Sequence, residues 1–170
     1  LLELAQQLKL LEHPGWTRYF HAAEKNLQEF HLGCLWGGKG FLDQSWHPIL
    51  VPNKNATTIE ALILYEELSG RDMSEYIDGA LDAILTAQEK VGARPGAIVH
   101  RGTGRHKLGI GIYTARSVSG LMKAYQREPR EDVRACAGAA LGFLQGLVTP
   151  TGNLFGRYAD GSPIASPKMI

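Results

Sequence analysis

Cysteine is scarce in this chain of 170 residues, which has only two, Cys34 and Cys136. Two distant cysteines provide no disulfide framework, and neither has the close Cys or His neighbour that a zinc ligand set requires. The sequence therefore excludes a disulfide-stabilised module and predicts two free thiols, no metal site and no cofactor.

An excess of charge of one sign is also lacking, because 18 Lys and Arg face 17 Asp and Glu and leave a formal charge of +1. Nucleic acids and anionic membrane surfaces attract proteins with a clear basic excess, so we expect neither as a partner. No apolar run approaches the roughly 20 residues that span a bilayer.

The familiar signatures of nucleophilic catalysis are missing as well. The sequence shows no Ser-His-Asp order, no nucleophile elbow and no plausible Cys-His arrangement. The glycine-rich run 100–107 lacks the Walker spacing and the preceding strand of a phosphate loop. Catalytic residues, if any, must therefore be sought in the architecture of the chain.

What the sequence does contain is helical periodicity of two alternating kinds. Three segments carry one apolar stripe and one polar face, which is typical of a helix with one face in water. The three others are apolar on most sides and should be covered on most sides. The one-sided segments are 16–30, 72–89 and 130–147, and the more apolar segments are 1–12, 57–69 and 112–127.

The segments that follow the one-sided helices begin with a repeated phrase of Gly, any residue, Leu or Ile, and a large or β-branched apolar residue. The copies start at Gly33, Gly96 and Gly152. The helices repeat too, because Gly79-Ala80 matches Gly138-Ala139 and Arg71 matches Arg130, both at an offset of 59 residues. Such units must stack on one another to cover their apolar faces.

These patterns predict an all-α fold of tandem antiparallel helical hairpins. The hairpins cover about 1–30, 57–89 and 112–147, within one domain over 1–170. The spacings Thr57-x-x-Glu60 and Asp72-x-x-Glu75 are those of a capping box, so we expect a helix to begin at each. Glu60 is interpreted mainly as a capping residue, and His31 as a surface residue.

An inner helix, an outer helix, a glycine-led connector and the next inner helix resemble the (α/α) toroid. This is the six-hairpin architecture of many glycoside hydrolases, polysaccharide lyases and sugar epimerases. The resemblance covers nearly the whole chain but matches no family-specific catalytic motif. Three hairpins form a partial toroid, and the sequence opens on Leu1 within a helical pattern. We therefore expect a fragment of a longer protein, whose remainder, or a homo-oligomer partner, covers the exposed hairpin faces.

The resemblance implies an active cleft at the end where the connectors lie. The first connector is aromatic, and Trp36 and Trp46 suit stacking on sugar rings while Asp43, Gln44 and Lys39 suit bonds to hydroxyls. His47 is a further candidate substrate-binding residue. The alternative is that these rings only plug the end of the helical barrel.

The second connector is the most basic run of the chain and suits a carboxylate such as that of a uronic acid. A lyase or epimerase needs a base and a cation. His100 and Tyr113 are the candidates for the base, and the cation is expected from the arginines; Arg101, Arg105 and His106 are candidate substrate-binding residues. The alternative is a solvated loop.

A glycosidase instead needs two carboxylates at a defined separation. Asp43 and Asp160 are the candidate pair, and Glu60 could replace either. Arg157 is a candidate substrate-binding residue, although its match to Arg101 in the repeat also favours a structural role. Arg116, near the start of an inner helix, faces the same predicted cleft.

The leading functional hypothesis is a carbohydrate-active α/α-toroid domain that acts on a glycan, including one with uronic acids, as a hydrolase, lyase or epimerase. One alternative is a non-catalytic helical repeat module that binds a protein partner. Another is a terpenoid-cyclase-like domain, although only Asp160-Gly161-Ser162-Pro163 approaches the repeat motif of that group.

Overall fold

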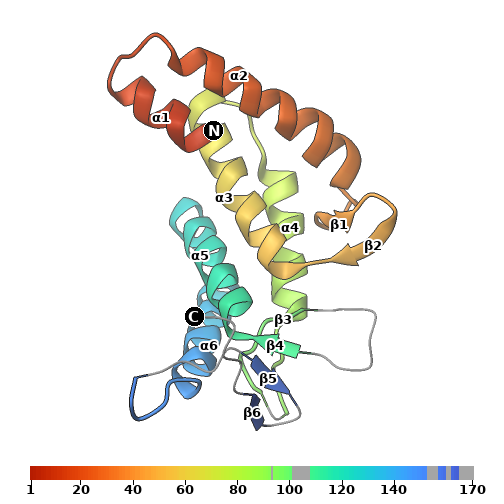
Figure 1. Ribbon diagram of the computed structural model, residues 1–170. Helices are drawn as coiled ribbons and strands as arrows, with labels where there is room; N and C mark the ends of the chain where they lie inside the picture. The colour runs from red at the N-terminus through yellow and green to blue at the C-terminus, as the bar shows by residue number, and fades with distance from the viewer. Residues whose placement is uncertain (93, 101–107, 153–156, 160–161, 165–170) are drawn as a thin grey trace.

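The computed structural model describes residues 1–92, 94–100, 108–152, 157–159 and 162–164. Within these residues the chain is predominantly helical, which confirms the predicted all-α class (Figure 1). The helices are α1 (Leu2–Leu10), α2 (Trp16–Asn26), the π-helix η1 (Leu27–Leu35), α3 (Pro52–Ser69), α4 (Ser74–Ala87), α5 (Gly111–Arg127) and α6 (Glu131–Gly146).

The α-helices pack as three consecutive pairs, α1 with α2, α3 with α4, and α5 with α6. We call these pairs hairpins 1, 2 and 3. The most extensive contact between hairpins joins α3 to α5, and α1 also contacts α3. The more apolar segments of the sequence are thus the inner helices α1, α3 and α5, whereas α2, α4 and α6 are the outer ones. Whether further hairpins complete a toroid stays a prediction.

Short strands occupy the connectors between hairpins. In the first connector, residues 36–51, β1 (Leu42–Gln44) pairs antiparallel with β2 (His47–Leu50). A second sheet has the order β3-β4-β5-β6 and is antiparallel throughout. Its strands are β3 (Val99–His100) and β4 (Leu108–Ile110) from the second connector, residues 88–110, and β5 (Arg157–Ala159) and β6 (Ser162–Ile164) from the terminal segment.

The core is centred on α3, where Ala56, Ile59 and Leu62 are fully buried. The helix approaches α5 so closely that a Cβ atom added at Gly120 would lie 2.6 Å from the Cα atom of Ala56. A contact this short requires glycine, because real Cβ atoms almost never come within 3.0 Å of another heavy atom. Gly120 therefore sets the separation of the two inner helices.

An arginine in the turn of each later hairpin reaches back to a carboxylate on the preceding outer helix. Arg71 Nη2 lies 3.5 Å from Glu24 Oε1 of α2, and Arg130 Nη1 lies 3.2 Å from Asp78 Oδ1 of α4. The Tyr65 hydroxyl also donates to Glu24 at 2.8 Å and holds the pKa of that carboxyl below its ordinary value. Arg71 and Arg130, which are 59 residues apart, thus make the same kind of contact with the preceding hairpin.

One of the two predicted helix starts differs from the structure. The helix α3 begins at Pro52 rather than Thr57, because proline is favoured in the first turn of a helix. Thr57 therefore lies inside the helix, where its hydroxyl donates to Asn53 O at 3.0 Å, and the interpretation of Glu60 as a capping residue is wrong. Asp72 does act near a helix start, because its carboxylate accepts bonds from Ser74 N and Ser74 Oγ.

The first copy of the repeated phrase also differs from the other two. Gly96 and Gly152 have positive φ angles of 90° and 82°, but both lie in the connecting segments beyond the ends of α4 and α6 and cap neither helix. Gly33 instead lies within η1, so the helical path continues to Leu35. Periodicity over 16–30 indicates a helix there but does not reveal a change from α to π winding.

Candidate functional site

The first connector presents two of the predicted site residues to solvent. Asp43 lies on β1 and Trp46 lies in the β1–β2 turn, where 78% of its surface is exposed. Lys54 Nζ donates to Asp43 O at 2.6 Å and fixes this hairpin to the start of α3. His47 begins β2. An exposed indole and a carboxylate on one β-hairpin can contact a sugar ring and its hydroxyls.

Trp36 has a different environment, because its ring is packed within the protein. The ring centroid lies 5.2 Å from that of Phe41 and 5.0 Å from that of Tyr76. A Cβ atom added at Gly79 would meet the Trp36 ring at 2.5 Å, so the indole occupies the space above that glycine. This packing gives Trp36 a structural role between the first connector and α4.

The second sheet brings the second connector and the terminal segment together. His100 lies on β3 and Arg157 on β5, with β4 between them. The strand β4 leads directly into α5, whose first turn carries the partly exposed Tyr113. The predicted residues Arg101, Arg105, His106 and Asp160 lie outside the described part of the chain.

A pocket of about 320 Å³ opens on the inner helices, bounded by α1, α2, η1, α3 and α5. We call it the inner pocket. Its polar wall is formed by a network between α3 and α5. Glu60 Oε1 accepts a bond from Ser119 Oγ at 2.6 Å, while Glu60 Oε2 is paired with Arg116. Arg116 Nε donates to Thr57 Oγ1 at 3.1 Å.

This network fixes the orientation of Thr57, Glu60 and Arg116 at the pocket. Each carboxylate oxygen of Glu60 accepts one bond from the network and retains a second lone pair. The Arg116 side chain is 42% exposed, so part of its guanidinium faces water. The wall can therefore accept bonds from ligand hydroxyls and donate bonds to ligand oxygens.

His31 lines the inner pocket from η1, and sequence analysis missed it by placing it on the surface. Its Nδ1 is buried without a hydrogen-bond partner in the described structure. Burial, and then the charge of Lys54, lower the pKa of His31 below its ordinary value of 6.5, so the ring is neutral at pH 7. The Nε2–H tautomer is favoured, because the other tautomer would bury an unpaired N–H.

Apart from Glu3 and Asn26, the remainder of the inner pocket is apolar. Leu2, Leu27 and Leu64 line it together with Ala23 and Ala61. An apolar floor with polar groups along one wall is the usual design of a small-molecule site, and the volume lies at the small end of the range for such sites. The π winding of η1 is a further indication, because short π-helical turns occur frequently at functional sites.

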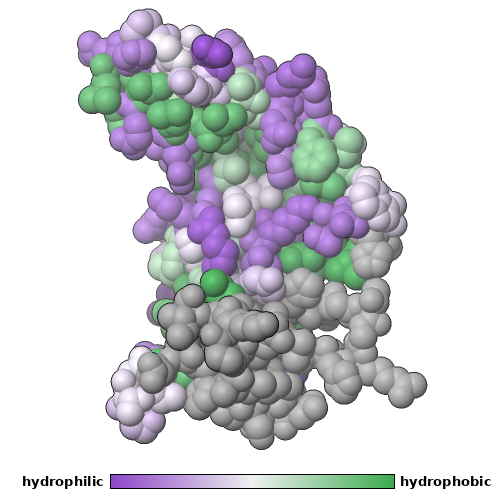
Figure 2. Space-filling model, viewed as in Figure 1, coloured by the Kyte–Doolittle hydropathy of each residue, from purple (hydrophilic) through white to green (hydrophobic). Residues whose placement is uncertain are grey.

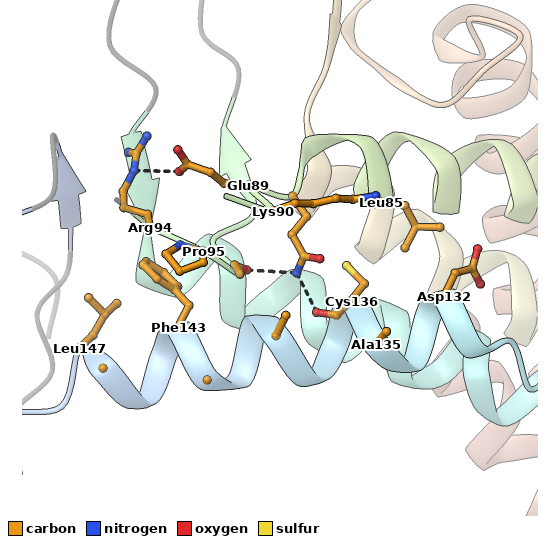
Figure 3. A pocket seen from close by; sticks show the side chains of 15 residues that line it. Leu85, Glu89, Lys90, Arg94, Pro95, Asp132, Ala135, Cys136, Phe143 and Leu147 are labelled. Carbon is orange, nitrogen blue, oxygen red and sulfur yellow. Dashed lines mark hydrogen bonds and ion pairs between the residues drawn. The ribbon is translucent and has the colours of Figure 1, made fainter. Parts of the chain in front are cut away.

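A larger groove of about 850 Å³ lies outside, between the second connector and α6 (Figure 3). Its ends are polar, with Arg94 Nε 3.0 Å from Glu89 Oε2, whereas small residues of α6 form its floor. Gln88 Nε2 crosses the groove and donates to Gly96 O and Cys136 O, which joins the connector to α6 (Figure 3). These polar groups thus mainly hold the connector in place.

Two further properties of the described residues bear on function. They contain no cluster of three or more His, Cys, Asp or Glu side chains that could hold a metal ion. None of their helices is both long and apolar enough to cross a membrane.

Comparison with known proteins gives no relative from which a function could be transferred. No protein-family model, no curated protein and no solved structure matches this chain. The inner pocket and the connectors are therefore the features of the molecule from which a function can be inferred.

Proposed function

We propose that this chain is part of a carbohydrate-active domain of the α/α-toroid type, with a glycan as its ligand. The observation that carries the proposal is the inner pocket, where Glu60, Arg116 and His31 converge over an apolar floor between inner helices. A sugar has the matching chemistry, because its ring presents C–H groups on its faces and hydroxyls on its edges.

The polar groups of the pocket would act on the ligand in different ways. The Glu60 carboxylate accepts from ligand hydroxyls, and neutral His31 donates through Nε2–H. Arg116 supplies the cation that a uronic acid carboxylate requires, so the proposal includes glycans with uronic acids. The exposed Trp46 and Asp43 would hold a neighbouring sugar unit at the connector end. Catalytic roles for His100, Tyr113, Asp43 and Asp160 remain part of this hypothesis.

The test is a glycan-binding screen on the whole chain, followed by titration calorimetry with any neutral or uronic oligosaccharide that binds. Glu60→Gln should weaken binding by about tenfold or more, because a hydrogen bond to a charged group contributes about 1.5–3 kcal/mol. Glu75→Gln is the matched control, since Glu75 is exposed on α4 and lies outside the pocket. Equal affinities of the two variants would contradict the assignment of the pocket.

The pH dependence of binding gives a second measurement. Because His31 is neutral above a pKa that lies below 6.5, its protonation places a new charge in the pocket only as the pH falls through that value. Affinity for a neutral glycan should therefore be constant from pH 8 to pH 7 and decrease at lower pH. In His31→Asn this decrease should be absent, whereas its persistence would assign the effect to another group.

A non-catalytic repeat module that binds a protein partner is the second candidate. The groove of about 850 Å³ between the second connector and α6 favours this alternative, because apolar and small side chains dominate its lining (Figure 3). Under this alternative Glu60→Gln leaves partner binding unchanged, whereas Ala139→Arg, which fills the groove floor, abolishes it. Paired measurements on the two variants distinguish the candidates.

A further inference from the structure

The inner pocket adjoins another cavity of about 320 Å³, which lies between the helices α1, α3 and α5. We call this cavity the second pocket. Glu3, Glu60 and Leu64 line both cavities, so the inner pocket and the second pocket meet at these residues. Figure 2 shows hydrophilic residues on the surface between the positions of α1 and α5 in Figure 1, the two helices that form opposite sides of the second pocket.

The second pocket follows the same face of α3 one helical turn further along the chain. On α3 the inner pocket is lined by Thr57, Glu60, Ala61 and Leu64, and the second pocket by Glu60, Ile63, Leu64, Glu66 and Glu67. One turn of an α-helix advances about 5.4 Å along its axis, which is close to the length that each sugar unit adds to an oligosaccharide. The two cavities are thus spaced as two consecutive units of one glycan require.

The lining of the second pocket matches the chemistry of a sugar ring. Ile63 and Leu64 provide apolar surface, while Glu67 and Lys123 contribute exposed charged groups. Gln6 Nε2 donates to Glu67 Oε2 at 3.1 Å, so α1 holds this carboxylate at the pocket. Carboxylates accept bonds from hydroxyls, and the ammonium group of lysine donates bonds to their oxygens.

Two further charged groups of the second pocket are bound to each other. Arg127 Nε lies 2.7 Å from Glu66 Oε2, and Arg127 Nη2 lies 3.0 Å from Glu66 Oε1, which also accepts a bond from Met73 N. This pair therefore has a structural role. Within the described part of the chain, by contrast, neither Glu3 nor Lys123 has a hydrogen-bond or ion-pair partner, so both are available to a ligand.

We propose that the ligand of this site is an oligosaccharide of at least two sugar units, with one unit in the inner pocket and the next in the second pocket. Glu3 and Glu60 would lie beside the bond that joins the two units, because both line both cavities. Together the two cavities reach the middle of the usual size range of ligand sites, whereas each alone is at its lower end. This inference rests on the proposed function and specifies the length of its ligand.

The test is titration calorimetry of the whole chain with the monosaccharides glucose, xylose, mannose and galacturonic acid, and with a disaccharide of each. The disaccharide of a sugar that binds should bind at least about tenfold more tightly than the monosaccharide, because the second unit gains hydrogen bonds to charged groups. Glu67→Gln should weaken binding of the disaccharide by about tenfold and leave the monosaccharide unchanged, since Glu67 lines only the second pocket.

Two reference variants separate this inference from the proposed function. Glu60→Gln should weaken binding of both the monosaccharide and the disaccharide, whereas Glu75→Gln on α4 should affect neither. Circular dichroism and thermal melting establish that each variant is folded. If Glu60→Gln weakens binding but Glu67→Gln has no effect on the disaccharide, or if the disaccharide binds no more tightly than the monosaccharide, the second pocket is not part of the site. Equal affinities of Glu60→Gln and Glu75→Gln, or no binding of any of these sugars, would overturn the proposed function and this inference together.

Discussion

The outer helices α4 and α6 are equivalent in the repeat, but their small-residue faces have opposite surroundings. On α4, the first connector covers this face, with the Trp36 ring above Gly79 and Gly40 against the Cβ atom of Ala83. On α6, no atom of the described residues outside the helix's own backbone lies within 4 Å of where a Cβ atom would stand at Gly138, Gly142 or Gly146. The second connector contacts a neighbouring face of α6, through Gly96 at Ala139.

This difference shows that one glycine pattern has two physical meanings. On α4 the absence of a side chain makes room for a neighbour that is present. On α6 the same absence leaves exposed backbone, which lowers helix stability without a compensating contact. Substitutions at equivalent positions should therefore have different, and even opposite, effects on the free energy of unfolding.

The largest effect is expected at Gly96, where the second connector touches α6. Its φ angle is 90°, and an added Cβ atom would lie 2.1 Å from Ala139 O. Gly96→Ala should cost about 3 kcal/mol or more of unfolding free energy, measured by urea denaturation, because strain and overlap add. Gly152→Ala is the matched control, with φ 82° and no described atom within 4 Å of the added Cβ atom, and should cost only about 1 kcal/mol. Equal losses of unfolding free energy in the two variants would show that Gly96 is not in tight contact with Ala139 of α6.

The next effect compares the two outer helices directly. Gly79→Ala should destabilise the protein by about 1–3 kcal/mol, because the new methyl group collides with the Trp36 ring. Gly138→Ala should instead stabilise it by about 0.5–1 kcal/mol, since alanine is the better helix former in open space. Thermal melts of the two variants should shift in opposite directions, and shifts of the same sign would refute the comparison.

A smaller effect is expected for the contact between successive hairpins. Asp78→Asn removes the carboxylate that Arg130 reaches, and both side chains are partly exposed, so the loss should be below about 1 kcal/mol. The loss should shrink further in high salt, which screens exposed charges. Glu75→Gln on the same helix serves as the reference. A loss that salt does not reduce would indicate a packing role for Asp78.

The smallest expected effect is a difference in reactivity between the two cysteines. Burial raises the pKa of the Cys136 thiol to about 11, because the charged thiolate is poorly solvated inside the protein. Cys34 is exposed on η1. A thiol reagent at pH 8 should modify one cysteine per folded chain and the second only after unfolding. Rapid modification that survives Cys34→Ser would show that α6 opens readily.

The helices could be predicted from the sequence because their evidence is local. Apolar residues at helical spacing place α4 and α6 within a few residues, and the offset of 59 residues identifies equivalent positions. The connectors are less predictable. Trp36 is an aromatic residue in a loop, and only the position of Gly79 across the fold shows that its ring is packed.

The candidate site was predicted less completely, because it too depends on contacts between segments that are distant in the sequence. Glu60 and Arg116 were both identified near inner-helix starts, but their pairing depends on the crossing of α3 and α5. His31 carried no signal, because a histidine beside Phe30 on an amphipathic segment resembles many surface residues. Its burial follows from η1, and π winding has no sequence pattern as regular as that of an α-helix.

The arginine contacts between hairpins also have a consequence for protein engineering. Hairpin 2 contains both groups of the contact between hairpins, since the arginine Arg71 lies in its turn and the carboxylate of Asp78 lies on its outer helix. Arg130, the equivalent of Arg71, already pairs with Asp78. A designer who inserts further copies of hairpin 2 in tandem would therefore place each Arg71 opposite the Asp78 of the copy before it. The natural chain thus contains a unit with matched ends from which longer arrays can be built.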